Sequence, residues 1–331
     1  MSSIRFLTST DEHLADQNPG YRKDSYKDAI LAKLEWQGEL ARRLECAAVH
    51  RGGDFIHVKP ANKTTMGTLA KAAAIHRKYP CPTYSVCGNH DMSFNDPESI
   101  PRQPLGVLLK SGVFRPLKDE TFVSGSMSVR VVGVDYTTDL AHDTLRDLVR
   151  KKDGDTYTIA VVHALAAYAP EERIQSFFNE TVFDYRDLVF DGCPDVYVFG
   201  HYHKDQGVRE HLGTQFINLG AVSRGALTFE NLERRPKVSS ITCTSSGISV
   251  DVHEIPCEDA SKVFDLDKKK EVERSRKNLD DFIKQLKSTT MENYGLDEKL
   301  AHLRTSPDYP DELRNVILDA MEAAETGDVE A

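Results

Sequence analysis

Residues 82–91 read Pro-Thr-Tyr-Ser-Val-Cys-Gly-Asn-His-Asp, an extended apolar run that ends in a glycine and three polar side chains. The run is typical of a buried strand, and Asn89, His90 and Asp91 would then stand at its carboxyl end. Open α/β sheets place their sites at that edge, and the glycine permits the backbone to turn sharply there. The stretch therefore predicts an α/β fold with polar ligands at the ends of its strands.

Other short clusters repeat this arrangement along the chain. Strand-like runs precede Asp11-Glu12-His13, His163 and Gly200-His201-Tyr202-His203, and Gly53-Asp54 again places a glycine next to an acid. Asp, His and Asn supply the oxygen and imidazole ligands that Mn, Fe, Zn or Mg accept. Two such ions close together can clamp the attacking and leaving oxygens of an in-line phosphoryl displacement. Together the clusters predict two-metal hydrolysis of a phosphoester.

The order of these motifs over residues 4–255 resembles that of the calcineurin-like metallophosphoesterases, and most of all the SbcD-type DNA repair exonucleases. Gly53-Asp54-Phe55-Ile56-His57 resembles the G-D-x-F-H element of those nucleases. Residues 104–112 and 218–224 also resemble stretches of theirs. The resemblance implies an α/β fold, a four-layer αββα sandwich of two mixed sheets over residues 1–256. A C-terminal helical extension would follow over residues 257–331.

The resemblance also implies roles for the ligands. One metal would be held by Asp11, His13, Asp54 and His203, and the second by Asp54, Asn89, His163 and His201, with Asp54 bridging both. His90 would protonate the leaving oxygen or stabilise charge on the phosphate, Asp91 would orient His90, and His57 would position the phosphate for exonucleolytic cleavage. A hydroxide activated by both metals would attack phosphorus. The two divalent ions are expected to be Mn²⁺, with Fe, Zn or Mg as alternatives.

Glu12 and His57, which stand near the ligands in the sequence, each have two interpretations. Glu12 is either an acceptor for an imidazole N–H of a ligand or a solvated loop acid. His57 is either functional, as the G-D-x-x-H context favours, or a surface histidine. Within His201-Tyr202-His203, alternation along an extended segment would put both imidazoles on one side.

Composition fits a soluble enzyme, although the charge is unusual for a nuclease. The 331 residues carry 40% hydrophobic residues and a formal net charge of −10, whereas nucleic-acid-binding domains are typically basic. A basic group either flanks a phosphate backbone or forms a solvated helix face. It consists of Lys59, Lys63, Lys71, Arg77 and Lys78.

The cysteine pattern and the distribution of apolar residues predict where the protein is located in the cell. The six cysteines form no C-x-x-C pair, as expected for reduced thiols. No apolar run approaches the length of a membrane span, and the strand-like run Ile4–Leu7 begins at once, so no signal peptide is expected. We therefore expect a cytoplasmic protein that does not contact a membrane.

Apolar periodicity predicts further elements. Helices are expected over Tyr26–Ala48 and Met66–Arg77, and a helix followed by a turn over Glu171–Asp187. Strands of a second sheet are expected over Met127–Val134, Thr214–Leu219, Lys237–Cys243 and Gly247–Ile255. Helical runs over Asp265–Lys287 and Asp311–Ala324 either pack on the same domain or bind a partner. The resemblance implies that this partner is the coiled coil of an SMC-like, SbcC-type ATPase, and that the protein forms a homodimer.

Three functions remain open on these grounds. The first is an SbcD-like DNA nuclease, an exonuclease or endonuclease. The second is a small-molecule phosphodiesterase or phosphatase, acting for example on a cyclic nucleotide, which the acidic charge favours. The third is a binding module without activity, against which the complete ligand set argues.

Overall fold

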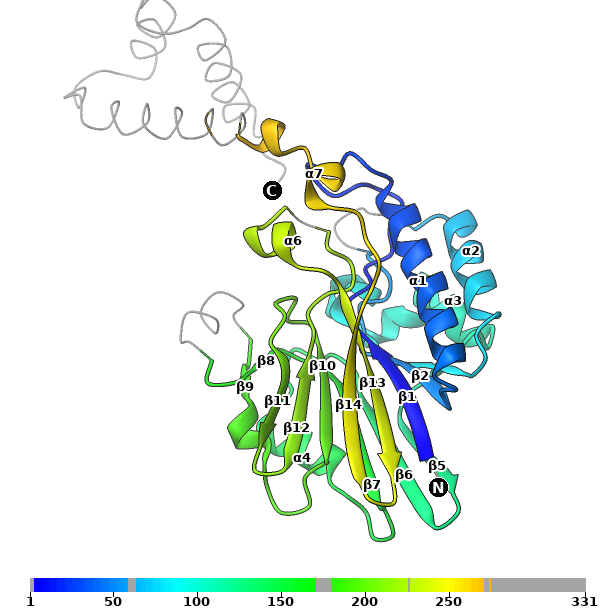
Figure 1. Ribbon diagram of the computed structural model, residues 1–331, viewed down its shortest axis with the longest axis vertical. Coiled ribbons are helices and arrows are strands. Elements are labelled where there is room, and N and C mark those ends of the chain that lie inside the picture. Colours follow the sequence, from blue (N-terminus) through cyan, green and yellow to red (C-terminus); the bar gives the residue numbers. More distant parts are fainter. Residues whose placement is uncertain (1–2, 59–63, 171–179, 226, 271–273, 275–331) are drawn as a thin grey trace, which may run out of the picture. The chain divides into compact units, whose positions relative to one another are not determined.

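A computed structural model describes residues 3–58, 64–170, 180–225, 227–270 and 274 (Figure 1). The chain divides into two units, residues 1–264 and 265–331. The first unit holds all the strands of the described residues and all the predicted site residues, and the description below concerns it alone. Most of the predicted extension over residues 257–331 lies outside the described residues, so its boundary and its helices stay predictions.

The first sheet is mixed. Its strand order is β14 (Gly247–Glu254), β13 (Lys237–Thr244), β1 (Ser3–Ser9), β2 (Ala48–Arg51), β3 (Thr83–Ser85) and β4 (Phe114–Pro116). Strands β1 to β4 run parallel, whereas β13 is antiparallel to β1 and β14 to β13. The register places Ser9 of β1 beside Arg51 of β2, so these two strands end at the same edge.

The second sheet is also mixed. Its order is β11 (Gly207–His211), β12 (Thr214–Asn218), β10 (Val196–Gly200), β7 (Tyr157–His163), β6 (Met127–Val134) and β5 (Asp119–Ser124). The four inner strands run parallel and both edge strands are antiparallel to their neighbours. Gly200 of β10 pairs with His163 of β7, so these strands too end together. A separate short pair joins β8 (Ala166–Ala167) to β9 (Phe183–Asp184).

The two sheets pack face to face, with helices outside them (Figure 1). Phe6, Val161 and Val198 lie in the core between the sheets. The outer face of the first sheet packs against α1 (Tyr26–Arg43), α2 (Met66–His76) and α3 (Pro104–Lys110). The second sheet is covered by α4 (His142–Val149) and the 3₁₀ helix η4 (Tyr185–Leu188). The predicted four-layer αββα arrangement is confirmed.

Local sequence explains where α1 begins and ends. The Ser25 hydroxyl caps its first turn by accepting a hydrogen bond from the Asp28 amide at 3.4 Å, which satisfies one of the amides that a helix start leaves unpaired. Arg42 and Arg43 in the last turn complement the helix dipole. The predicted helix ran on to Ala48, which is wrong, because Glu45 adopts a left-handed backbone with φ 51° and Ala48 already begins β2.

Three further expectations need correction or lie partly outside the described residues. Strands β13 and β14 belong to the first sheet, not the second, because β13 pairs with β1 and the Thr8 and Ser239 hydroxyls hydrogen-bond at 2.5 Å. Residues 171–179 of the predicted helix lie outside the described residues, and the remainder forms β9 and η4. Of the basic group, residues 59 and 63 are also outside, and Lys71, Arg77 and Lys78 are exposed.

The remaining small elements are α6 (Phe229–Glu233), α7 (Ala260–Val263) and the 3₁₀ helices η1 (Asn89–Asp91), η2 (Ser93–Asn95) and η3 (Pro97–Arg102). Among the described residues, no helix combines the length and the apolar character needed to cross a bilayer.

Candidate metal centre

The predicted ligands follow the carboxyl ends of five strands drawn from both sheets. Those ligands are Asp11 and His13 after β1, Asp54 after β2, Asn89 after β3, His163 at the end of β7, and His201 and His203 after β10. The loops after β1 and β2 are tied to each other, because the Asp11 amide donates to Gly53 O at 3.1 Å and the His13 amide to Asp54 O at 2.9 Å. The structure thus brings all the predicted ligands to one place.

Four of these ligands have a left-handed backbone. The φ angles are 58° at Asp11, 48° at His13, 52° at Asp54 and 90° at His201. Residues other than glycine seldom adopt this region, and they persist there where the surrounding structure holds them. The expected extended segment from His201 to His203 is therefore wrong, since β10 ends at Gly200 and the chain turns at once.

Glycines line the turns so closely that a side chain would enter the site. A Cβ atom on Gly88 would lie 2.1 Å from Asp54 Oδ1, and one on Gly53 would lie 2.3 Å from His163 Nδ1. Gly200 is equally restricted, because its Cβ would lie 2.3 Å from Gly52 O. At these three glycines the backbone itself packs against the site, which leaves no room for a side chain.

A first group of ligand atoms comprises Asp11, His13, Asp54 and His203. His13 Nε2 lies 2.9 Å from His203 Nε2 and 3.6 Å from Asp54 Oδ2. His203 Nε2 also lies 3.7 Å from Asp11 Oδ1. The same Asp11 carboxylate accepts a hydrogen bond from the His201 amide at 3.0 Å, which links the two ligand loops.

A second group shares Asp54 and adds Asn89, His163 and His201. His163 Nε2 lies 3.5 Å from Asp54 Oδ2. Asn89 Oδ1 lies 3.3 Å from His163 Nε2 and 3.1 Å from His201 Nδ1. His201 and His203 therefore reach different groups on either side of Asp54.

The donor set fits a pair of divalent cations. Asp54 Oδ1 accepts a hydrogen bond from the His90 amide at 2.7 Å, but Asp54 Oδ2 is buried and accepts none from the described residues. Burying a carboxylate oxygen without a hydrogen bond is costly. This oxygen faces an imidazole nitrogen of both groups, which is the arrangement that a bridging ligand requires. Imidazole and carboxylate donors of this kind suit Mn, Fe or Zn.

The protonation states also bear on cation binding, because metal ligands must be deprotonated. Burial holds the pKa of His13 well below its ordinary value, whereas the His203 side chain is 51% exposed. Burial raises the pKa of Asp11 to about 6. Burial opposes protonation of His163, but the charges of Asp54 and Asp11 outweigh it and raise the pKa of His163 to about 9. Metal binding must therefore displace a proton from His163 at neutral pH, and from Asp11 as well below about pH 6.

The predicted catalytic histidines lie beside the first group. The His57 ring stacks on that of His90, with centroids 4.5 Å apart, and His57 Nδ1 lies 3.0 Å from His13 Nδ1. His13, His57 and His90 form a third group of nitrogen atoms close enough to share a ligand. Asp91 accepts hydrogen bonds from the Ile56 amide at 2.7 Å and the Gly88 amide at 2.9 Å, so it fixes the turn that carries His90.

Glu12 matches neither of its two interpretations. Its side chain is fully buried, and its Oε1 accepts hydrogen bonds from Arg51 Nη1 at 2.6 Å and from Ser9 Oγ at 2.5 Å. It is neither a solvated acid nor, in these contacts, an acceptor for an imidazole. No sequence pattern indicates this pairing, because Arg51 lies in β2, 39 residues further along the chain.

Glu180 and Tyr136 are additional residues of the site. Glu180 Oε2 lies 2.9 Å from His201 Nε2, and the Tyr136 hydroxyl donates to Glu180 Oε1 at 2.9 Å. A carboxylate on the second nitrogen of an imidazole fixes the ring and raises its basicity. No motif surrounds either residue, so pattern alone could not find them.

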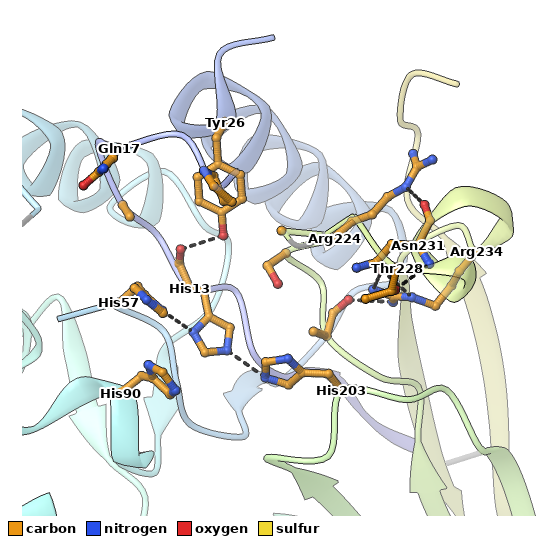
Figure 2. A pocket seen from close by; sticks show the side chains of 15 residues that line it. His13, Gln17, Tyr26, His57, His90, His203, Arg224, Thr228, Asn231 and Arg234 are labelled. Atoms are coloured by element: carbon orange, nitrogen blue, oxygen red, sulfur yellow. Dashed lines mark hydrogen bonds between the residues drawn. The ribbon is translucent and has the colours of Figure 1, made fainter. Parts of the chain in front are cut away.

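A cavity of about 310 Å³ adjoins the first group (Figure 2). His13, His57, His90 and His203 line its wall toward the metal centre. The facing residues labelled in Figure 2 are Arg224, Thr228, Asn231 and Arg234, whereas Tyr26 of α1 lies beside His13 and donates to its carbonyl oxygen at 2.8 Å. The cavity therefore joins the predicted catalytic side chains to a wall formed by residues after β12.

Comparison with solved structures finds proteins whose sequence identity to this chain is low. The protein TT1561 of Thermus thermophilus is 14% identical over 76% of this chain and 99% of its own, with a TM-score of 0.44. The calcineurin-like phosphoesterase YfkN from Bacillus subtilis is 11% identical over 86% and 99%, with a TM-score of 0.49. A dimetal phosphatase from Danio rerio is 12% identical over 76% and 99%, with a TM-score of 0.45. No curated protein matches the chain.

The family is shown by the sequence itself. The profile of the calcineurin-like phosphoesterases matches residues 5–205, which is more than half of the chain. That span contains the ligand loops after β1, β2, β3, β7 and β10. With its ligand groups on either side of a shared aspartate, the chain belongs to the calcineurin-like phosphoesterases, a family of metal-dependent phosphoester hydrolases.

Proposed function

We propose that this protein is a two-metal nuclease of the SbcD type, which hydrolyses phosphodiester bonds in DNA. The observation that carries the proposal is His57. This histidine follows Asp54 by three residues in the G-D-x-x-H element, and its ring stacks on His90 at the edge of the cavity. A surface histidine with no task in the site would not need that position.

Backbone hydrogen bonds fix the chain at His57 and at the next residue, Val58. The His57 amide donates to Leu14 O at 3.1 Å and the Val58 amide to His90 O at 3.0 Å. These bonds connect the loop after β2 to the loops that carry His13 and His90. The imidazole is therefore positioned before substrate arrives, as catalytic preorganisation requires.

The proposed chemistry divides between the cations and the chain. When bound to the two ligand groups, the divalent cations, for which we propose Mn²⁺, lower the pKa of a water molecule and neutralise charge on the phosphate. His90 donates a proton to the leaving oxygen. His57 orients the phosphate by hydrogen bonding to one of its oxygens. Glu180 fixes the ring of His201, and Asp91 fixes the turn of His90.

Two observations favour an alternative substrate, a small phosphodiester such as a cyclic nucleotide. The cavity of about 310 Å³ is at the lower end of the range for small-molecule sites. The formal net charge of −10 would also repel a long polyanion. The second candidate is therefore a small-molecule phosphodiesterase built on the same residues.

A substrate panel separates the two. The full-length protein with Mn²⁺ is assayed on linear duplex DNA, single-stranded DNA, bis-p-nitrophenyl phosphate and cyclic nucleotides, and its metal content is measured by elemental analysis. The nuclease proposal expects cleavage of DNA, with end-labelled DNA distinguishing exonuclease from endonuclease action. Hydrolysis of cyclic nucleotides without cleavage of DNA would establish the alternative.

His57→Ala adds a sharper test. The variant should lose at least about tenfold more kcat/KM on DNA than on bis-p-nitrophenyl phosphate, because a positioned hydrogen bond to a charged phosphate is worth about one to two powers of ten. His211→Ala, on the edge strand β11 and away from the ligand groups, is the matched control. Equal losses on both substrates would remove the reason for preferring a nuclease.

Partners and location are proposed on the resemblance alone. We propose that residues 257–331 bind an SMC-like, SbcC-type ATPase, that the protein forms a homodimer, and that it acts in the cytoplasm. Light scattering of the purified full-length chain tests the dimer. Copurification with a coexpressed SMC-like ATPase, compared with a chain ending at residue 264, tests the ATPase proposal.

A further inference from the structure

The cavity beside the metal centre is bounded by cations on the side away from it. Arg224 and Arg234 both line it, together with the polar residues Ser223, Thr228 and Asn231 (Figure 2). Among the described residues that line the cavity, none is acidic. In a chain whose formal net charge is −10, this local excess of positive charge favours an anionic occupant.

Arg234 is the cation best placed to contact such an occupant. Its side chain is half-buried, and its guanidinium is held by several hydrogen bonds, among them those to Ala221 and Asn231. Arg234 Nη1 donates to Ala221 O at 2.6 Å, and Nη2 and Nε both donate to Asn231 Oδ1, at 2.9 and 3.3 Å. A guanidinium fixed in this way loses little conformational entropy when it binds a ligand.

Arg224 supplies charge from a deeper position. The residue is only 4% exposed. Its Nε donates to Asn231 O at 2.7 Å, and its Nη1 donates to Glu258 O at 2.7 Å. These carbonyl acceptors are neutral, so they orient the guanidinium without cancelling its charge. Arg224 therefore strengthens the positive potential that surrounds Arg234.

Backbone hydrogen bonds also connect the cavity wall to the ligand loops. The Ala221 amide donates to His203 O at 3.2 Å, and the Ser223 amide donates to Asp11 O at 3.1 Å. His203 and Ala221 both line the cavity. A phosphate held at the metal centre and an anion held by Arg234 would thus contact the same rigid wall.

We propose that Arg234 binds a second phosphate group of the substrate, the neighbour of the scissile phosphate along a nucleic acid chain. The guanidinium fork matches the oxygens of a phosphate. Substrates with two phosphates are then bound more tightly than those with only the scissile one. This inference rests on the proposed nuclease function, and it makes Arg234 a residue that determines substrate specificity.

The test compares substrates that differ by one phosphate. The full-length protein with Mn²⁺ is assayed on the thymidine dinucleotides TpT, pTpT and TpTp, and on bis-p-nitrophenyl phosphate. We expect KM for pTpT or for TpTp to be about tenfold lower than for TpT, the size of one charge-assisted hydrogen bond to phosphate. Which of the two is preferred gives the direction in which the strand lies.

Arg234→Ala should remove that preference. The variant should raise KM about tenfold for the preferred dinucleotide and leave TpT and bis-p-nitrophenyl phosphate within about twofold. Arg234→Lys keeps the charge without the fork, so it should restore part of the difference. Arg235→Ala is the matched control, because Arg235 is the adjacent residue, its side chain is 49% exposed, and it pairs with Asp259.

Different results would refute the second-phosphate site and the proposed nuclease function. Equal KM values of the unmodified protein for TpT, pTpT and TpTp, with all three cleaved, would overturn the second-phosphate site and leave the nuclease standing. An equal loss of Arg234→Ala on all four substrates would also overturn it, because the residue would then act only through the Ala221 carbonyl. Hydrolysis of bis-p-nitrophenyl phosphate alone, with no dinucleotide or DNA cleaved, would refute the nuclease itself.

Discussion

Glu12 and Arg51 form a salt bridge of 2.6 Å between two fully buried side chains. Glu12 stands between Asp11 and His13, both of which have a left-handed backbone. Arg51 is the last residue of β2 and leads into the turn of Asp54. The pair therefore joins the loop of one strand to the end of the next, where both deliver ligands.

Removing one partner of this pair should destabilise the fold strongly. Arg51→Met leaves the Glu12 carboxylate buried without its cation, and the free energy of unfolding should fall by about 3–5 kcal/mol. Urea unfolding followed by circular dichroism measures this change. Arg42→Met is the control, because the Arg42–Glu39 pair is 48% and 69% exposed, so solvent screens it and its loss should change stability little. Equal effects of the two substitutions would contradict a special role for the buried pair.

Metal binding should release protons and tighten as the pH rises. The pKa of Asp11 is raised to about 6 and that of His163 to about 9, so both hold protons that a cation must displace at lower pH. Apparent Mn²⁺ affinity should therefore rise with pH up to about 9. Isothermal titration of the metal-free protein, in two buffers with different ionisation enthalpies, measures affinity and proton release together. An affinity that does not change between pH 6 and pH 9 would contradict the assigned ligands.

Gly88→Ala should abolish metal binding without unfolding the protein. The new Cβ would lie 2.1 Å from Asp54 Oδ1 and force the shared carboxylate out of place. Metal content by elemental analysis and activity on bis-p-nitrophenyl phosphate should both fall, by at least about a hundredfold for activity. Gly67→Ala is the control, since its Cβ meets only Thr65 Oγ1, at 3.9 Å, in helix α2. That substitution should retain activity and stabilise the helix by about 0.5–1 kcal/mol.

Lys33 should make stability depend on pH above neutrality. Its ammonium is buried and donates to Val222 O at 2.5 Å and Ser223 O at 3.3 Å, and burial lowers its pKa from 10.5 to about 7. Between those two values the unfolded chain binds more protons than the folded one, so stability should rise with pH across this window. The contribution of Lys33 is at most about 1.4 kcal/mol per pH unit.

Urea unfolding at pH 7, 8 and 9 measures that slope. Lys33→Met should flatten it, because methionine does not titrate. Lys71→Met, a substitution on the exposed surface of α2, should leave the slope as it is. An unchanged slope in Lys33→Met would show that another group is responsible.

The ligand positions could be predicted from the sequence because they depend on local patterns. Asn89 and His163 each follow an apolar strand, and the parallel strands of a sheet bring such ends together. Which sheet a strand joins depends on distant pairing, so alternation in Lys237–Cys243 could not reveal that this strand pairs with β1. The same limit applies to Glu12, whose partner lies in another strand, and to Glu180, which meets His201 only in the folded chain.

The left-handed backbone at Asp11, His13, Asp54 and His201 also bears on how this protein would evolve. At each of these positions glycine would fit the backbone with less strain. Backbone strain at these positions is therefore a cost that the fold carries in order to place its ligands, and a substitution at any of them changes the strain and the metal site together.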